Sequence, residues 1–261
     1  MRPADDHATS TPRPRVVVII QARMGSTRLP GKVLADIVGQ PMLPRVVERA
    51  RRAKTVDEVA VATTTDPADE AVASMCAQRG YACFRGHPTD VLDRYYRAAR
   101  QFRADVIVRL TADCPLIDPG VMDLTVRAFL DADPPVDLVA NRLPQGRTFP
   151  IGLDTEVCSF EALERAWKEA DQPHQREHVM PYLYEVPGRF RVVLVNNDTD
   201  YGMLRWTVDT ADDLELVRAI YARFKGRDDF SWWEVLKLFE QEPSLGEINA
   251  GVRHKTHRDV G

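Results

Sequence analysis

Apolar and polar positions follow two different periods along this chain. Short runs rich in valine and isoleucine predict buried strands, and longer stretches with apolar residues three or four positions apart predict amphipathic helices. Strands are expected at residues 15–20, 58–62, 81–84, 105–110, 137–140, 156–159, 190–195 and 204–208. Helices are expected at residues 41–52, 67–79, 90–102, 119–130, 160–170, 176–184 and 211–224.

The predicted strands and helices alternate in chain order. This alternation indicates an α/β fold with a doubly wound, mostly parallel sheet. The first four strands are short and apolar, as expected when helices cover both faces of the sheet. Asp118-Pro119 and Thr210 with Asp213 fit the N-termini of helices. Residues 141–201 break the simple alternation, and we expect an inserted lobe or a dimerisation arm there.

Length and composition are those of a soluble globular protein. The chain has 261 residues, of which 44% are hydrophobic and 28% are charged. We expect a single domain over residues 15–242. Residues 1–14 lack the apolar segment of a secretory signal and are expected to form a disordered leader. Residues 243–261 are expected to form a polar tail.

Charge and hydropathy exclude several classes of partner. The net charge of −4 gives no electrostatic reason to expect nucleic acid or an anionic membrane. No apolar run approaches the roughly 20 residues that a bilayer span requires. The four cysteines form no CxxC pair and no zinc-like spacing with histidine, so we expect reduced thiols and a cytoplasmic protein.

The most informative stretch is QARMGSTRLPGK, residues 21–32, directly after the first predicted strand. Its backbone N–H groups and the cations Arg23, Arg28 and Lys32 suit anionic oxygens. Three cations this close repel one another unless an anion with several charges, such as a triphosphate, lies among them. The stretch is not a P-loop, because the glycine spacing differs and Val33 replaces the metal-binding hydroxyl. A solvated basic loop is the alternative.

Two carboxylates are expected at the same edge of the sheet. Asp113 follows the strand predicted at 105–110, and Asp209 follows the one at 204–208. In parallel sheets, ligands bind outside the carboxyl ends of the strands. One or two carboxylates, completed by water and phosphate oxygens, are the usual ligands of Mg²⁺. The alternative is that each aspartate only caps a helix or turn.

The loop, extended as QARMGSTRLPGKVLADIVGQPML, resembles the N-terminal signature of cytidylyltransferases that make CMP-activated acid sugars. The nearest groups are the CMP-Kdo synthetases, the acylneuraminate cytidylyltransferases and the SpsF-type spore-coat polysaccharide proteins. The likeness covers about residues 15–225 and continues in the blocks RGHPTDVLDRYYRAA, RLTADCPLIDP, FPIGLDTEVCSFEALERAWKEA, QREHVMPYLYE and RWTVDTADDLELV. This ordered series is typical of the SpsF-like group.

The resemblance implies a Rossmann-like, mixed and mostly parallel sheet of the nucleotide-diphospho-sugar transferase (GT-A-like) type. It implies transfer of CMP from CTP to a small-molecule acceptor, an acid sugar, with release of pyrophosphate. The product would serve surface polysaccharide or glycoconjugate biosynthesis. It also implies Mg²⁺ as cofactor, held by Asp113 and Asp209, and a homodimer formed through residues 141–201.

The resemblance also assigns roles to individual residues. We expect catalytic roles for Arg23, Lys32, Asp113 and Asp209. Residues expected to bind the nucleotide and its phosphates are Ala22, Arg23, Gly25, Ser26, Thr27, Arg28 and Lys32, with Arg85 as a base or ribose contact. The family often has glycine where Ala112 stands, which leaves the shape of that loop open.

The acceptor is expected to bind in the irregular section. Asp154 and Glu156 lie at alternate positions of an expected strand, so both would point to one face. They suit hydroxyl or amino groups of a substrate, although paired surface acids are the alternative. Arg176 and His178 would face the same cleft or a dimer contact. The cations available for a carboxylate are Arg142, Arg147 and Arg176.

Other functions remain possible at this point. The same chemistry could act on a non-sugar alcohol or a phosphonate. A glycosyltransferase that consumes a nucleotide sugar would need fewer cations than this loop carries. A non-catalytic nucleotide-binding protein would be favoured only if the two aspartates were missing. No residue stands out as a dedicated general base.

Overall fold

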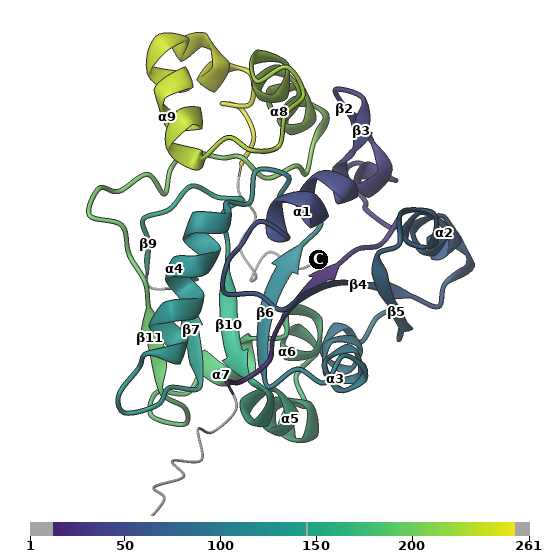
Figure 1. Cartoon of the computed structure of the whole chain (residues 1–261), viewed down its shortest axis with the longest axis vertical. Helices are drawn as coiled ribbons and strands as arrows, with labels where there is room; N and C mark the ends of the chain where they lie inside the picture. The colour runs from purple at the N-terminus through teal and green to yellow at the C-terminus, as the bar shows by residue number, and fades with distance from the viewer. Residues whose placement is uncertain (1–12, 145, 254–261) are drawn as a thin grey trace, which may run out of the picture.

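The computed structural model describes residues 13–144 and 146–253, which form a three-layer α/β domain (Figure 1). The strands of its main sheet are β1 (Val16–Gln21), β4 (Glu58–Thr64), β5 (Ala82–Gly86), β6 (Val106–Thr111), β7 (Leu138–Ala140), β10 (Glu156–Ser159) and β11 (Val192–Leu194). The α-helices are α1 (Met42–Ala50), α2 (Glu70–Arg79), α3 (Val91–Gln101), α4 (Pro119–Leu130), α5 (Phe160–Glu169), α6 (Pro173–His178), α7 (Pro181–Tyr184), α8 (Ala211–Arg223) and α9 (Trp232–Gln241).

Shorter elements connect these. The 3₁₀ turns are η1 (Lys32–Leu34), η2 (Pro67–Asp69) and η3 (Pro243–Glu247). Two short hairpins are formed by β2 (Asp36–Ile37) with β3 (Gln40–Pro41), and by β8 (Arg142–Leu143) with β9 (Gly146–Arg147).

The main sheet has the strand order β11-β7-β10-β6-β1-β4-β5. Every neighbouring pair is parallel except the two pairs made by β10, which runs antiparallel to β6 and to β7. The predicted mixed, mostly parallel sheet is therefore confirmed. Because Gln21 of β1 is in register with Thr111 of β6, the loops after these two strands leave the sheet side by side.

The central strand β1 shows why helices cover both faces. Val16 to Ile20 are fully buried, and successive side chains of a strand point to opposite faces. Val16, Val18 and Ile20 pack with residues of α1, α2 and α4, while Val17 and Ile19 pack with residues of α3, α5 and α7. Figure 1 shows α1 and α4 in front of the sheet and α3 and α5 on its other side.

A third cluster of buried residues lies beyond the carboxyl edge of the sheet. It joins α8, α9 and η3 to Ile37, Met42 and Leu116. Figure 1 shows α8 and α9 side by side above α1. Helices α8 and α9 with η3 thus form a helical cap over the end of the sheet where the loops of β1 and β6 emerge.

The strand predicted at 204–208 is wrong. This segment forms only one bridge, between Ile151 and Arg205. Gly152, with φ of +109°, lies so near Thr207 that a Cβ on it would be 2.7 Å from the Thr207 nitrogen. The backbone then turns away, with the N–H of Leu153 donating to the carbonyl of Pro150, and the ladder cannot extend.

The single helix predicted at 176–184 is also wrong. Val179 has φ of +71° and separates α6 from α7. Pro181 lacks the N–H that a continuous helix would require at that position, so a new helix starts there. Helix α9 was not predicted, although Ser231 and Glu234 form a capping box at its start.

The expected boundaries of the domain differ from those observed. Within 141–201, β10 and β11 join the main sheet, and the β8–β9 hairpin forms a separate two-stranded ladder. The domain extends past residue 242, because Leu245 and Asn249 of the expected tail are buried. Residues 1–12 of the expected leader and 254–261 of the expected tail lie outside the described residues.

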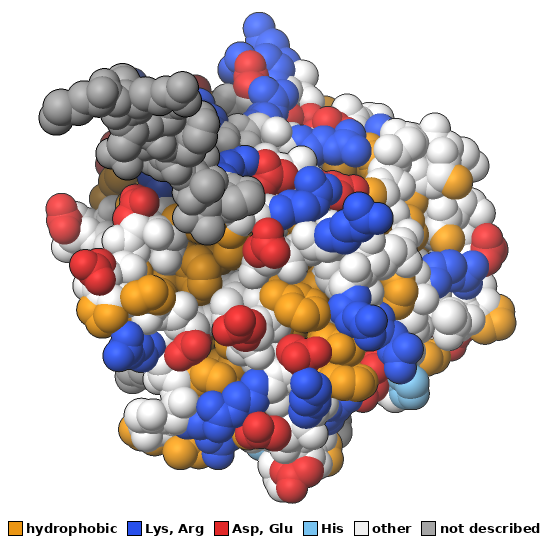
Figure 2. Space-filling view, turned by 60° about the horizontal axis from the view of Figure 1, so that its bottom comes forward, with side chains coloured by type: hydrophobic (Ala, Val, Ile, Leu, Met, Phe, Trp, Pro, Cys, Tyr) orange, Lys and Arg blue, Asp and Glu red, His pale blue; other side chains and the backbone are white. Residues whose placement is uncertain are grey.

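Surface properties can be stated for the described residues. Figure 2 shows one face on which basic and acidic side chains are interspersed. Across residues 13–144 and 146–253, no helix is both long enough and apolar enough to cross a bilayer. The four cysteines have free thiols, and three of them are buried.

Two buried arginines of α1 fasten the helical cap to the sheet. Arg49 donates to the carbonyls of Ile117 at 2.7 Å, Asp228 at 2.8 Å and Phe230 at 3.0 Å. Arg45 donates to the carbonyl of Gly226 and to the carboxylate of Asp228. Both side chains are almost fully buried, so their hydrogen bonds replace contacts that the carbonyls would otherwise make with water.

We predict that Arg49→Met destabilises the protein by about 3 kcal/mol, because it leaves two buried carbonyls and one half-buried carbonyl without their donor. Chemical denaturation would measure the loss in the free energy of unfolding. Arg52→Met is the control, because Arg52 is exposed on the turn that follows the same helix. Equal stability of the two variants would contradict this account of the cap.

Candidate functional site

The loop of residues 21–32 leaves the carboxyl end of β1 and is fixed by polar contacts. The N–H of Met24 donates to buried Asp69 at 2.6 Å, and the N–H of Gly31 donates to the carbonyl of Met24 at 3.0 Å. Gly31 has φ of +71°, a conformation that favours glycine. Gly25 has open space where a Cβ would lie. The shape of the loop therefore depends on Gly31 more than on Gly25.

This loop forms one wall of a cavity of about 250 Å³. The cavity is lined by Gln21, Ala22, Arg23, Gly25, Ser26, Thr27, Arg28, Lys32, Val33, Arg94, Thr111, Ala112, Asp113 and Asp209. All the residues predicted in the loop thus line it, together with both predicted aspartates. Within the described residues, the N–H groups of Gly25, Thr27 and Arg28 make no hydrogen bond to the protein. These donors are available to an anionic ligand.

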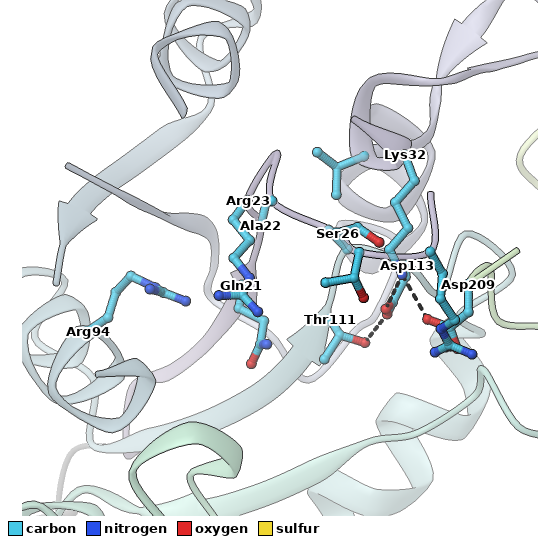
Figure 3. Close-up of a pocket in the computed structure, with 14 residues that line it drawn as sticks. Gln21, Ala22, Arg23, Ser26, Lys32, Arg94, Thr111, Asp113 and Asp209 are labelled. Atoms are coloured by element: carbon cyan, nitrogen blue, oxygen red, sulfur yellow. Dashed lines mark hydrogen bonds and ion pairs between the residues drawn. The ribbon is translucent and has the colours of Figure 1, made fainter. Parts of the chain in front are cut away.

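Lys32 joins the two aspartates. Its Nζ donates to Asp113 Oδ2 at 2.9 Å and to Asp209 Oδ1 at 2.9 Å (Figure 3). It also donates to the carbonyl of Val208 at 2.7 Å. Asp113 is also held by the hydroxyl of Thr111, which donates to Oδ1 at 2.6 Å. Ala112 has no positive φ, so alanine fits this loop without strain.

A buried network of hydrogen bonds and ion pairs, which was not predicted from the sequence, holds Asp209 in place. Arg205 donates to Asp209 at 2.7 Å and to Asp213 at 2.9 Å, and its side chain is 6% exposed. Asp213 is fully buried and also accepts from the N–H of Asp209 and from the amide of Asn249. Asp209 therefore keeps its place without the strand that was expected to end at it.

Neighbouring charges favour the ionised form of Asp209 and the protonated form of Lys32. Burial alone would raise the pKa of Asp209, but Lys32, Arg205 and Arg28 outweigh it and lower the pKa to about 2. Burial alone would lower the pKa of Lys32, but the two carboxylates outweigh it and raise that pKa. At neutral pH Asp209 is therefore ionised and Lys32 is protonated.

Arg94 lies at the opposite end of the cavity. Figure 3 shows it on α3, with Gln21, Ala22 and Arg23 between it and the Asp113–Asp209 pair. Arg94 is 1% exposed, and its Nε has no hydrogen-bond partner among the described residues. Burial lowers the pKa of Arg94, and the nearby charge of Arg23 adds to this effect. The sequence signal is a charged residue on the apolar face of α3, between Val91 and Tyr95.

Arg85, the predicted base or ribose contact, does not line the cavity. Its guanidinium pairs with Glu70 and donates to the carbonyl of Thr64 at 3.1 Å. The two arginines lie on either side of the β5–α3 loop. Arg94 therefore replaces Arg85 as the arginine that reaches the cavity from this region.

The four residues predicted for the acceptor lie outside the cavity lining. Asp154 precedes β10 and pairs with Arg147, so it does not share a strand face with Glu156. Glu156 is buried and pairs with Arg109, which also donates to Gln21 at 3.1 Å. Glu156 is thus connected to the cavity through Arg109 and Gln21.

Arg176 and His178 both belong to helix α6. Arg176 is engaged by Asp90 through several contacts and donates to the carbonyl of Trp167 at 2.7 Å. Its charge is therefore already paired within the fold. His178 is half-buried in the last turn of the same helix. Their roles in acceptor binding stay predictions.

The donor set fits a magnesium ion that arrives with phosphate groups. The described residues contain no cluster of three or more acidic, histidine or cysteine side chains suited to a metal. Asp113 and Asp209 are close enough for one ammonium to touch both. Mg²⁺ commonly takes one or two carboxylates and fills its other positions with water and substrate phosphates. The two carboxylates suit that mode of binding.

A family model described as Cytidylyltransferase matches residues 17–222. The chain belongs to the cytidylyltransferase family. This cytidylyltransferase is 32% identical to the spore coat polysaccharide biosynthesis protein SpsF of Bacillus subtilis, over 87% of the chain and 95% of that protein. The predicted resemblance to SpsF-type proteins is therefore confirmed.

Solved structures agree with this assignment. A cytidylyltransferase from Leptospira borgpetersenii superposes with a TM-score of 0.86 and 33% identity, covering 93% of this chain and 100% of that one. A CMP:2-keto-3-deoxy-manno-octonic acid synthetase complexed with CTP superposes with a TM-score of 0.60 and 26% identity, covering 80% and 99%. This cytidylyltransferase therefore belongs with the nucleotidyltransferases in both fold and sequence.

We predict that Asp209 contributes to stability above about pH 4 and loses this contribution as the pH falls towards 2. The sign follows from a folded pKa of about 2, below the ordinary value of 3.8, which corresponds to about 2 kcal/mol. Urea unfolding of the wild type and Asp209→Asn across this pH range would measure it. The difference between the two proteins should shrink as the solution becomes more acidic, and a constant difference would contradict the assigned pKa.

Proposed function

We propose that this protein transfers CMP from CTP to the hydroxyl of an acid sugar and releases pyrophosphate. The product would be an activated sugar for surface polysaccharide or glycoconjugate synthesis. The observation that carries the proposal is the cavity that combines an anion-binding loop with a carboxylate pair. Membership of the cytidylyltransferase family supports CTP as the donor. The likeness to a spore coat polysaccharide protein and an acid-sugar synthetase supports the acceptor class.

The loop end of the cavity suits the triphosphate. Arg23, Arg28 and Lys32 supply positive charge, and the N–H groups of Gly25 and Thr27 supply neutral donors. Asp113 and Asp209 would hold Mg²⁺. The ion would neutralise charge that develops on the phosphate oxygens. Positioning and charge stabilisation would supply most of the catalysis, as is usual for phosphoryl transfer.

At the α-phosphorus, the reaction forms one P–O bond and breaks one. The acceptor oxygen attacks the α-phosphorus of CTP, and the bond from that phosphorus to the oxygen bridging to the β-phosphate breaks. Pyrophosphate leaves with the bonding electron pair, and the proton of the acceptor hydroxyl passes to solvent. The chain's own residues bind and orient the two reactants.

The Arg94 end suits the cytosine base. Cytosine presents two adjacent acceptors, O2 and N3, whereas uracil presents a donor at N3. A guanidinium carries donors only, so it can pair with cytosine but opposes the N–H of uracil. The Nη1 of Arg94 donates to the carbonyl of His87 at 2.8 Å, whereas its Nε is buried and has no partner among the described residues, so a base could accept from it.

Arg142 is the arginine best placed to bind the acceptor. Strand β7 runs parallel to β6, so its carboxyl end lies at the same edge as the cavity, and Arg142 follows it closely. Arg147, its cross-strand neighbour, is paired with Asp154, and Arg176 is paired with Asp90. In the described part of the chain, Arg142 makes no ion pair. It is the candidate to bind the carboxylate of an acid sugar.

The test of this function is pyrophosphate release in the presence of Mg²⁺. CTP, UTP, ATP and GTP would each be combined with acid sugars, neutral sugars, simple alcohols and phosphonates. Release with CTP and an acid sugar supports the proposal. Release with CTP and only an alcohol or phosphonate would replace the acceptor class, and release with none of the pairs would overturn the function.

We predict that Asp113→Asn lowers turnover about 1000-fold without unfolding the protein, because it removes one charge from the ion's ligands. Asp131→Asn serves as the control, because Asp131 is exposed at the end of α4. Steady-state pyrophosphate release and circular dichroism would be measured for both variants. Full activity of Asp113→Asn would remove Asp113 from the metal site.

We predict that Arg94→Met lowers kcat/KM for CTP roughly 10- to 100-fold while changing the slow reaction with UTP little, so base selectivity falls. Met fills similar buried space without a charge. Arg85→Met is the matched control from the other side of the β5–α3 loop and should stay within about threefold of the wild type. A loss of selectivity in Arg85→Met instead would return the base contact to Arg85.

A further inference from the structure

Two of the three cations expected to hold phosphates, Lys32 and Arg28, contact the carboxylates expected to hold the metal. Lys32 Nζ contacts Asp113, Asp209 and the carbonyl of Val208, all within 2.9 Å. An ammonium has three N–H donors. All three are therefore used inside the protein, and none remains for a phosphate oxygen while this arrangement lasts.

Asp209 also forms an ion pair with a second cation of the loop, Arg28. Arg28 Nη2 lies 3.0 Å from Asp209 Oδ2, the same oxygen that accepts from Arg205 at 2.7 Å. The other oxygen, Oδ1, accepts from Lys32. Magnesium needs a carboxylate oxygen at about 2 Å and a nearly octahedral shell. An ion cannot enter between the two aspartates until Lys32 moves away.

The three cations around Asp209 differ in how firmly they are held. Arg205 is buried and tied to Asp213, whose other contacts fix it in the helical cap. The side chain of Arg28 is 32% exposed and makes only this one ion pair within the described residues. Lys32 has a long, flexible stem and lines the cavity. Arg28 and Lys32 can therefore turn towards a ligand while Arg205 stays in place.

We propose that Lys32 acts as an internal cation that keeps the Asp113–Asp209 pair closed to free divalent ions, and that the nucleotide triphosphate opens the pair by drawing Lys32 and Arg28 onto its phosphates. This rests on the proposed function, because it takes a triphosphate as the ligand of the loop. Metal and nucleotide then bind with positive coupling, and each raises the affinity for the other by the same factor.

This closed arrangement of Lys32 with the two aspartates, called the lock below, also has a chemical consequence for the enzyme without substrate. Without its ammonium, the carboxylate pair would attract any abundant divalent ion and hold it without substrate. With Lys32 in place, the charge of the pair is balanced by the protein itself. The same side chain that blocks the ion becomes a phosphate ligand when the ion arrives with the nucleotide.

The test measures Mn²⁺ binding without nucleotide, from the electron paramagnetic resonance signal of the free ion. Wild type, Lys32→Met and Lys32→Gln would be titrated, with Lys168→Met as the control. Lys168 is 56% exposed and pairs with Glu164 on the surface of α5. We expect Lys32→Met to bind Mn²⁺ at least about 10-fold more tightly than the wild type and the control, a typical coupling factor. Lys32→Gln serves in its place if the methionine variant does not fold.

A second substitution shows where the gained ion binds. Asp113→Asn in the Lys32→Met background should abolish the gain, because it removes one of the two carboxylates. Equal Mn²⁺ affinity in the wild type and the folded Lys32 variants would overturn the lock. So would a gain that survives Asp113→Asn.

The two proposals fail separately. Pyrophosphate release by the wild type with CTP, together with unchanged Mn²⁺ binding in the Lys32 variants, keeps the function and removes the lock. Tighter Mn²⁺ binding in those variants, with no release from any nucleotide, keeps the closed pair and removes the proposed function.

Discussion

The arrangement of the site depends on one ammonium group between two carboxylates. Lys32 lies 81 positions from Asp113 and 177 from Asp209 in sequence, and its Nζ is within 2.9 Å of both. It joins the loop after β1, the loop after β6 and the segment that enters α8. The anion-binding loop, the sheet edge and the helical cap therefore meet at a single buried charge.

The parts that could be predicted from sequence are those with a local physical cause. Five consecutive apolar residues, 16–20, indicate a strand covered on both faces, and β1 has that position. Loops after parallel strands gather at one edge, so Lys32 and Asp113 were expected to meet. Asp209 was also predicted at this edge, but for the wrong reason. It follows a single bridge and not a strand, and Arg205 and Asp213 hold it in place.

The parts that could not be predicted arise from contacts between distant residues. Arg85 and Arg94 are nine positions apart; the place of Arg94 on the apolar face of α3 marks it as buried, but that it lines the cavity follows only from the packing of α3. The segment around Trp206 has the composition of a strand. Its backbone lies against that of Gly152 over too few residues to form a ladder. Glu156 reads as a substrate ligand, but its partner Arg109 lies on a neighbouring strand that sequence spacing does not reveal.

The buried amide of Asn249 adds a constraint on biosynthesis. It donates to Asp213 and to the carbonyl of Arg205, and the side chains of these two residues contact Asp209. A ribosome makes this residue after every strand of the sheet and every other group in the site. The sheet can therefore form on the nascent chain while the carboxylate pair still lacks its final support. Catalytic competence would be acquired as a late step, after residue 249 has left the exit tunnel and docked.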